Sequence, residues 1–173
     1  AVVLSGARPV FMAPEIDHVR GVAHGVSLAT VERSLEQHPD AKAVLVVNPT
    51  YFGVCADLKG IAELVHERDI PLLVDEAHGA HLYFHPDLPC PAMAAGADAA
   101  ATSMHKLGGS LTQSSILNVQ GTRLSSDRVQ AVLSMMTTTS TSYILLASLD
   151  AARRYLATQG KELWTRAIAL AQQ

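Results

Sequence analysis

The sequence is poor in features that would assign it to several specialised classes of protein. It has two cysteines in 173 residues, Cys55 and Cys90, and they form no CxxC pair, so neither a disulfide framework nor a cysteine metal site is expected. It also has no apolar run of the roughly 18 residues that cross a bilayer. We therefore expect no membrane association.

An excess of positive charge is missing as well. The chain has 13 Lys and Arg residues against 16 Asp and Glu residues, which gives a formal net charge of −3. Such a chain lacks the cationic surplus that neutralises a nucleic-acid backbone, so nucleic acid is not an expected partner. Residues 1–7 lack the basic flank and long apolar stretch of a signal peptide, and we therefore expect a cytoplasmic protein.

The composition that is present, 49% hydrophobic and 17% charged, is typical of a folded domain with its own core. Residues 43–47 form a continuous apolar run, which predicts a strand buried on both faces. Residues 72–74 predict a second strand. Between them, apolar residues recur at helical spacing after Asp57, a good N-cap. Together the three segments predict a β-α-β unit with parallel strands.

Two further strands are predicted at 97–102 and 115–119. Strands that alternate with helices define an α/β fold, so we expect a mostly parallel sheet flanked by helices. Both ends of the chain interrupt a pattern. We therefore expect residues 1–173 to form a single incomplete domain.

The last third of the sequence is predicted to be helical. A helix at 127–136 is expected to turn its apolar residues inward. A second helix at 143–158 is expected to break at Gly160, because glycine is common just past a helix end. A final helix is expected from Lys161 onward.

Polar side chains that can do chemistry follow the ends of two predicted strands. Asp75 and His78 follow the second strand, and Ser103, His105 and Lys106 follow the third. In doubly wound sheets, ligands bind beyond the carboxyl ends of the strands. These residues are therefore expected to meet at one edge of the sheet.

Asp75 is the candidate acid of this edge. A carboxylate at the end of a buried strand is costly unless a cation or a hydrogen-bond donor pairs with it. A protonated pyridinium ring is one such cation, and the carboxylate would keep the ring nitrogen charged and the ring a strong electron sink. The alternative is that Asp75 caps a following helix.

Lys106 is the candidate nucleophile. It lies at a predicted strand-to-loop junction, where desolvation favours the neutral amine that forms an imine. Ser103 and His105 offer donors suited to a phosphate group, and the glycines at 108–109 let the backbone approach closely. The alternative is an ordinary solvated lysine in a loop.

The combination of an aspartate at one strand end and a Ser-Met-His-Lys motif at the next is a narrower signal than either alone. With the stretches around it, the chain resembles the Orn/Lys/Arg decarboxylase family, the bacterial basic amino acid decarboxylases of fold type I. The matching stretches are 42–53, 71–81, 103–106, 110–115 and 143–153.

This resemblance implies the C-terminal part of a fold type I large domain, with pyridoxal phosphate bound as a Schiff base on Lys106. Asp75 would pair with the ring nitrogen. The remaining cofactor-binding residues would be Ala77 against a ring face, His78 near the cofactor or substrate, and Ser103 and His105 at the phosphate.

The activity implied is decarboxylation of arginine, lysine or ornithine to agmatine, cadaverine or putrescine. Lys106, Asp75 and His105 would be the catalytic residues, with Lys106 or His105 returning a proton to Cα. The family works as homodimers or larger homo-oligomers, and residues 137–142 would lie near the subunit boundary. Residues 1–48 depart from the family, because they contain neither its phosphate-binding turn nor its ring-stacking side chain.

Three alternatives stay open. An α-oxoamine synthase or an aminotransferase can also place Asp and Lys at strand ends, although the His before Lys106 and the residues at 111–115 favour the decarboxylase. A truncated, non-catalytic fragment would keep the fold without the activity. A metal site built from the eight histidines is not expected, because His78 and His81 lack metal-binding spacing and no cysteine joins them.

Overall fold

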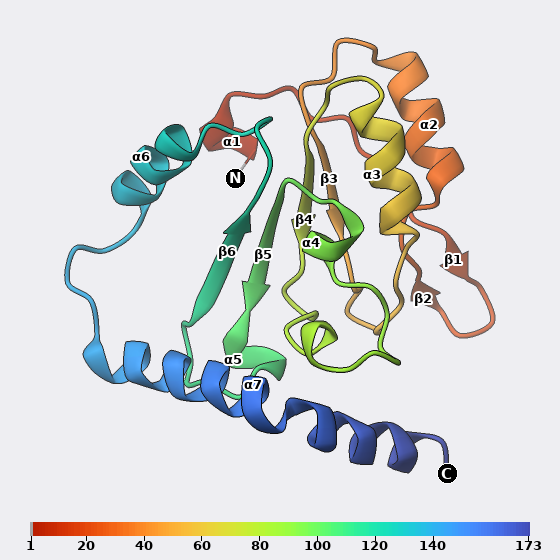
Figure 1. The fold of residues 1–173 in the computed structure, drawn as a ribbon. Coiled ribbons are helices and arrows are strands. Elements are labelled where there is room, and N and C mark those ends of the chain that lie inside the picture. The colour runs from red at the N-terminus through yellow and green to blue at the C-terminus, as the bar shows by residue number, and fades with distance from the viewer. Residues whose placement is uncertain (1) are drawn as a thin grey trace.

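A four-stranded sheet organises the protein, whose computed structural model describes residues 2–173; Ala1 lies outside the described residues. The strand order is β3-β4-β5-β6 (Figure 1). The first three strands are parallel, and β6 runs antiparallel to β5. The predicted α/β fold with a mostly parallel sheet is therefore confirmed. The strands are β3 (Val44–Val47), β4 (Leu72–Asp75), β5 (Ala99–Ser103) and β6 (Ser115–Val119).

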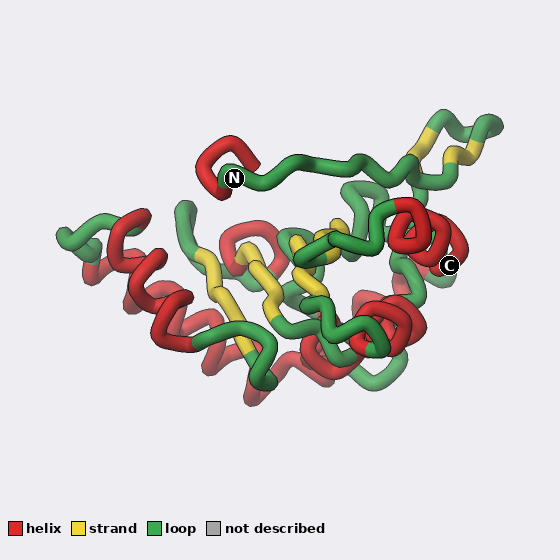
Figure 2. The backbone as a smooth tube through the Cα atoms, turned by 90° about the horizontal axis from the view of Figure 1, so that it is seen from above, coloured by secondary structure: helices red, strands yellow, loops and turns green. Residues whose placement is uncertain are grey.

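Helices and a small hairpin surround this sheet. The hairpin pairs β1 (Ile16–Asp17) with β2 (Val22–Ala23), and Figure 2 shows that the N-terminal stretch before it is mostly loop. Among residues 2–173, no helix combines the length and the apolar character needed to span a bilayer. The helices are α1 (Val2–Ser5), α2 (Leu28–Gln37), α3 (Leu58–His66), the 3-10 helix η1 (Leu82–Phe84), α4 (Ala92–Ala95), α5 (Met104–Leu107), α6 (Ser126–Met136) and α7 (Tyr143–Ala171).

The main core lies between one face of the sheet and the helices α2 and α3. The Asp57 side chain accepts a hydrogen bond from the Gly60 N–H at 3.0 Å, which confirms the predicted N-cap of α3. Each fully buried valine, leucine or isoleucine of this core stabilises the fold by roughly 1.5–3 kcal/mol. The largest contributors include Val31 from α2, Ile61 and Val65 from α3, and Val44, Val46, Leu72 and Val74 from the sheet.

The opposite face of the sheet is open within residues 2–173. Leu45 and Val47 of β3 are 60% and 49% exposed, and Leu117 and Val119 of β6 are exposed too. Successive side chains of a strand point to opposite faces, so only alternate residues reach the core. The predicted burial of β3 on both faces is therefore wrong for the described chain. Asp75 lies on this open face, in register with Val47.

Helix α6 also differs from its prediction. It begins at Ser126, and the Ser125 side chain accepts a hydrogen bond from the Arg128 N–H, which satisfies one unpaired donor of the first turn. None of its residues is buried, and Val132 is exposed. The apolar residues of this helix therefore have no inward face to occupy within residues 2–173.

The glycine at position 160 lies inside a helix instead of ending one. Helix α7 runs unbroken from Tyr143 to Ala171, so the predicted break at Gly160 and new start at Lys161 are wrong. Gly160 is buried, and a Cβ built there would lie 2.9 Å from the Phe84 Cβ. The glycine permits a close approach between α7 and η1, which explains why it is there.

This close approach predicts a large difference between two adjacent substitutions. Gly160→Leu should lower the free energy of unfolding by about 1–3 kcal/mol, because the new side chain must push α7 away from η1. Gln159→Leu is the matched control, since Gln159 is exposed and the change should stay within about 0.5 kcal/mol. Thermal and urea denaturation of the full-length gene product measures both. Equal stability of the two variants would contradict the packing described here.

Candidate active site

The carboxyl ends of β4 and β5 carry the residues that the sequence singled out. Asp75 is the last residue of β4, and Ser103 is the last residue of β5. Helix α5 follows Ser103 directly and carries His105 and Lys106. Because β4 and β5 are parallel neighbours, these residues lie at the same edge of the sheet, at the lower end in Figure 1.

The Lys106 amine contacts a histidine from the loop after β4. Its Nζ lies 3.3 Å from the Nε2 of His78. An ammonium can only donate, so Nε2 accepts and the ring proton belongs on Nδ1. That Nδ1 is buried and has no hydrogen-bond partner among residues 2–173. The Tyr51 ring packs at right angles to the His78 ring, with centroids 5.5 Å apart, which holds the imidazole from the side.

Asp75 is exposed, which corrects the expectation of a desolvated acid. One of its carboxylate oxygens accepts a hydrogen bond from the Ala77 N–H at 3.1 Å. The described residues give this carboxylate no other hydrogen bond and no ion pair. The reason is strand alternation, because Asp75 shares the open face of the sheet with its neighbours in register. Its negative charge is available to a ligand.

His105 and Ser103 offer polar groups of different character. The Nδ1 of His105 donates to the Ser114 carbonyl oxygen at 2.8 Å, which leaves Nε2 as the ring atom that can meet a ligand. Ser103 precedes α5, but its hydroxyl makes no capping hydrogen bond. The Ser103 hydroxyl and the His105 Nε2 are the two atoms of this pair that a ligand could use.

A cleft of about 760 Å³ opens beside Lys106 and His78. Burial lowers the pKa of His81 in its wall, so the neutral imidazole is favoured there. Burial also raises the pKa of the Cys55 thiol, which keeps it protonated. Within residues 2–173, no three His, Cys, Asp or Glu side chains gather as a metal-binding group. The lining residues are Pro49, Thr50, Tyr51, Gly53, Cys55, His78, His81, Leu82, Leu88, Pro89, Lys106 and Leu107.

Glu76 is a residue of this region that the sequence interpretation missed. It follows Asp75, is fully buried, and has hydrogen-bond donors on both carboxylate oxygens. Burial raises its pKa, and hydrogen bonds from Ala92, Tyr83 and Thr102 oppose that rise. The available signal was the period of two, which puts Glu76 on the inward face with Leu72 and Val74.

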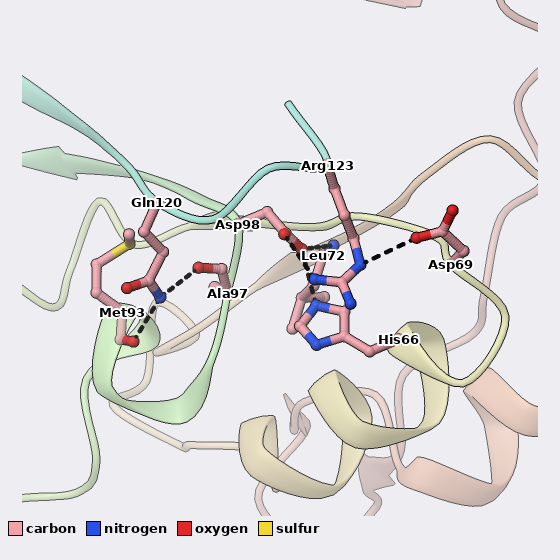
Figure 3. A network of polar contacts seen from close by, with 8 residues as sticks. All are labelled: His66, Asp69, Leu72, Met93, Ala97, Asp98, Gln120 and Arg123. Carbon is pink, nitrogen blue, oxygen red and sulfur yellow. Dashed lines mark hydrogen bonds and ion pairs between the residues drawn. The ribbon is translucent and has the colours of Figure 1, made fainter. Parts of the chain in front are cut away.

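A second buried carboxylate lies at the other end of the sheet. Asp98 precedes β5, and Figure 3 shows it between His66 and Arg123. Its Oδ2 accepts from the Leu72 N–H at 2.8 Å and lies 2.8 Å from the His66 Nε2, while its Oδ1 accepts from Arg123 at 3.4 Å. Nearby, the Gln120 side chain donates to two carbonyl oxygens before β5. This network joins β4, β5 and the end of β6 far from Lys106 along the strands.

The whole chain, residues 1–173, matches the sequence model of the family described as "Orn/Lys/Arg decarboxylase, major domain". The chain belongs to the Orn/Lys/Arg decarboxylase family. It is 63% identical to the arginine decarboxylase of Halalkalibacterium halodurans and 62% identical to that of Bacillus subtilis, over all 173 residues. It spans 35% of the length of each of these relatives.

Solved structures of low sequence identity show the same fold. The constitutive lysine decarboxylase of E. coli matches with a TM-score of 0.73 and 23% identity, over 95% of this chain and 25% of that one. The structural neighbours are fold type I enzymes that depend on pyridoxal phosphate, and so is the family. The family resemblance and the fold class predicted from the sequence are therefore confirmed.

Proposed function

We propose that the full-length protein decarboxylates a basic amino acid with pyridoxal phosphate, and that its substrate is arginine. The observation that carries the proposal is the contact of the Lys106 amine with His78 at the edge where β4 ends in Asp75. The curated relatives named arginine decarboxylase, at 62% and 63% identity, support arginine over lysine and ornithine. Agmatine would then be the product.

The side chains at this edge fit the three reactive parts of pyridoxal phosphate. Its aldehyde condenses with a primary amine, which Lys106 offers. Its ring nitrogen, when protonated, pairs with a carboxylate, and the Asp75 carboxylate is exposed. Its phosphate accepts hydrogen bonds, which the Ser103 hydroxyl and a protonated His105 can donate. When bound, the cofactor supplies an electron sink that accepts the electron pair of the broken bond to the α-carboxylate.

Each residue then has a role that follows from its chemistry. Lys106 holds the cofactor and frees it when the substrate amine takes its place. Asp75 keeps a proton on the ring nitrogen by its charge, while Ala77 packs against a ring face. His78 accepts a hydrogen bond from the Lys106 amine and so sets its direction. Lys106 or His105 returns a proton to Cα after carbon dioxide has left.

The alternative activities have less support. An aminotransferase or an α-oxoamine synthase would share the fold, but the chain belongs to a decarboxylase family. Because the chain spans 35% of the length of its curated relatives, the segment by itself can also be a non-catalytic part of the enzyme. Assembly as a homodimer or larger homo-oligomer and a place in the cytoplasm stay predictions.

The test is a substrate comparison with the full-length gene product and added pyridoxal phosphate. Carbon dioxide release from arginine, lysine and ornithine is measured together with the amine products and any keto acid. We expect agmatine and carbon dioxide in equal amounts, with kcat/KM for arginine at least roughly ten-fold above that for the other two. Keto acid without carbon dioxide would identify a transaminase and refute the proposal.

A further inference from the structure

The turn that carries two predicted cofactor-binding residues starts at Glu76. The Gly79 N–H donates to the Glu76 carbonyl oxygen at 2.9 Å and closes a four-residue turn with Ala77 and His78 at its centre. His78 is also the residue that contacts the Lys106 amine. The position of this turn therefore determines where the histidine meets the lysine.

The Glu76 carboxylate ties this turn to three other elements. Its Oε1 accepts from the Ala92 N–H, at the start of α4, at 2.8 Å. Its Oε2 accepts from the Tyr83 hydroxyl of η1 at 2.7 Å and from the Thr102 hydroxyl of β5 at 3.0 Å. The Glu76 N–H donates to the Ala101 carbonyl oxygen at 2.9 Å. A buried carboxylate with donors on both oxygens is held in one place, because any shift leaves a donor or the charge unpaired.

The turn rests directly on this side chain. A methyl group at position 79 would collide with the Cγ of Glu76 and approach the Pro49 Cδ to 3.0 Å. Gly79 therefore gives the backbone of the turn the room to close over the glutamate. Movement of the carboxylate would move Ala77 and His78 with it, since the turn has no space to stay in place.

We propose that Glu76 is a positioning residue for the reaction, whose carboxylate fixes the turn that presents Ala77 to the cofactor ring and His78 to the Lys106 amine. The inference rests on the proposed function, because it concerns the same cofactor. Glu76 itself lies on the core side of the strand and does not reach that site. Its effect passes through the turn.

The experiment compares two buried carboxylates at opposite ends of the sheet. Glu76→Ala and Glu76→Gln test the inference in the full-length gene product. Asp98→Ala is the matched control, because Asp98 is as buried as Glu76 and binds the same two strands away from the site. The readouts are the melting temperature, the Kd for pyridoxal phosphate, the visible circular dichroism of the bound cofactor, and kcat with arginine.

We expect Glu76→Ala to lower kcat by roughly 10- to 100-fold, since a displacement of about 1 Å can have that effect. It should also raise the cofactor Kd and change the visible circular dichroism band, which reports the asymmetric surroundings of the ring. Glu76→Gln keeps the shape, and the two hydroxyls can turn to accept from its amide, so it should stay within about three-fold of the wild type. Asp98→Ala should lower the melting temperature while kcat, Kd and the dichroism band stay near the wild-type values.

Two outcomes overturn the inference. One is a Glu76→Ala protein that loses only melting temperature, as Asp98→Ala does. The other, if that variant fails to fold, is a Tyr83→Phe/Thr102→Val double variant with wild-type dichroism and kcat, because it removes both donors from Oε2. Failure of the proposed function looks different, since the wild type itself would then show no cofactor band, and the inference falls with it.

Discussion

Replacement of Lys106 by alanine should remove the violet absorbance of bound pyridoxal phosphate and lower kcat/KM by roughly 10³-fold or more, as loss of a nucleophile does. No other lysine lines the cleft beside His78. The purified full-length variant would therefore be colourless after dialysis. Absorbance spectra and carbon dioxide release from arginine measure the two effects.

Lys59→Ala is the control for this experiment. Lys59 is exposed on α3, on the core side of the sheet, and its loss should leave both the colour and the activity unchanged. Lys106→Ala should also keep the wild-type melting temperature in the absence of cofactor, because the side chain is exposed and forms no ion pair among residues 2–173. A coloured, active Lys106→Ala enzyme would remove the basis of the proposed function.

Replacement of Asp75 by asparagine should separate cofactor binding from catalysis. The amide keeps the shape of the carboxylate but not its charge, so the ring nitrogen loses the group that keeps it protonated. We expect a protein that retains the violet band through Lys106 but whose kcat falls by roughly 10²- to 10³-fold, the effect of removing one group that stabilises transition-state charge. Spectra and steady-state kinetics with arginine give both values.

Asp127→Asn provides the comparison for Asp75. Asp127 is exposed in the first turn of α6 and makes no contact with the cleft, so its loss of charge should leave kcat unchanged. If Asp75→Asn also retained full activity, Asp75 would be a surface carboxylate with no part in the reaction. Loss of colour in Asp75→Asn would instead place its role in cofactor binding.

The sheet was predictable because its strands are short apolar runs that end in turn-forming residues, and β6 matches the predicted 115–119 without a shift. Which face of each strand is covered was less predictable. Leu45 and Leu117 are as apolar as the core residues, and the sequence does not state that within residues 2–173 nothing lies over them. A continuous apolar run therefore indicated a strand correctly and its burial incorrectly.

Glycine and glutamate were misjudged for a shared reason. Gly160 looked like a helix end and Glu76 like a companion of Asp75, because local rules consider only sequence neighbours. Both roles depend on residues distant in the chain, Phe84 for the glycine and Thr102 for the glutamate. The candidate site was placed at the correct edge of the sheet because its residues follow strand ends, which is a local property.

The antiparallel direction of β6 has a further effect at Lys106. The lysine lies on a short connection whose two ends belong to paired strands, and the Ser114 carbonyl oxygen accepts from Met104 N–H, His105 N–H and His105 Nδ1 across its base. The backbone under the lysine is thereby clamped. Exchange of one amine for another at Nζ then requires only rotation about the lysine's own methylene bonds, a motion of picoseconds to nanoseconds for exposed side chains. No loop has to open for it.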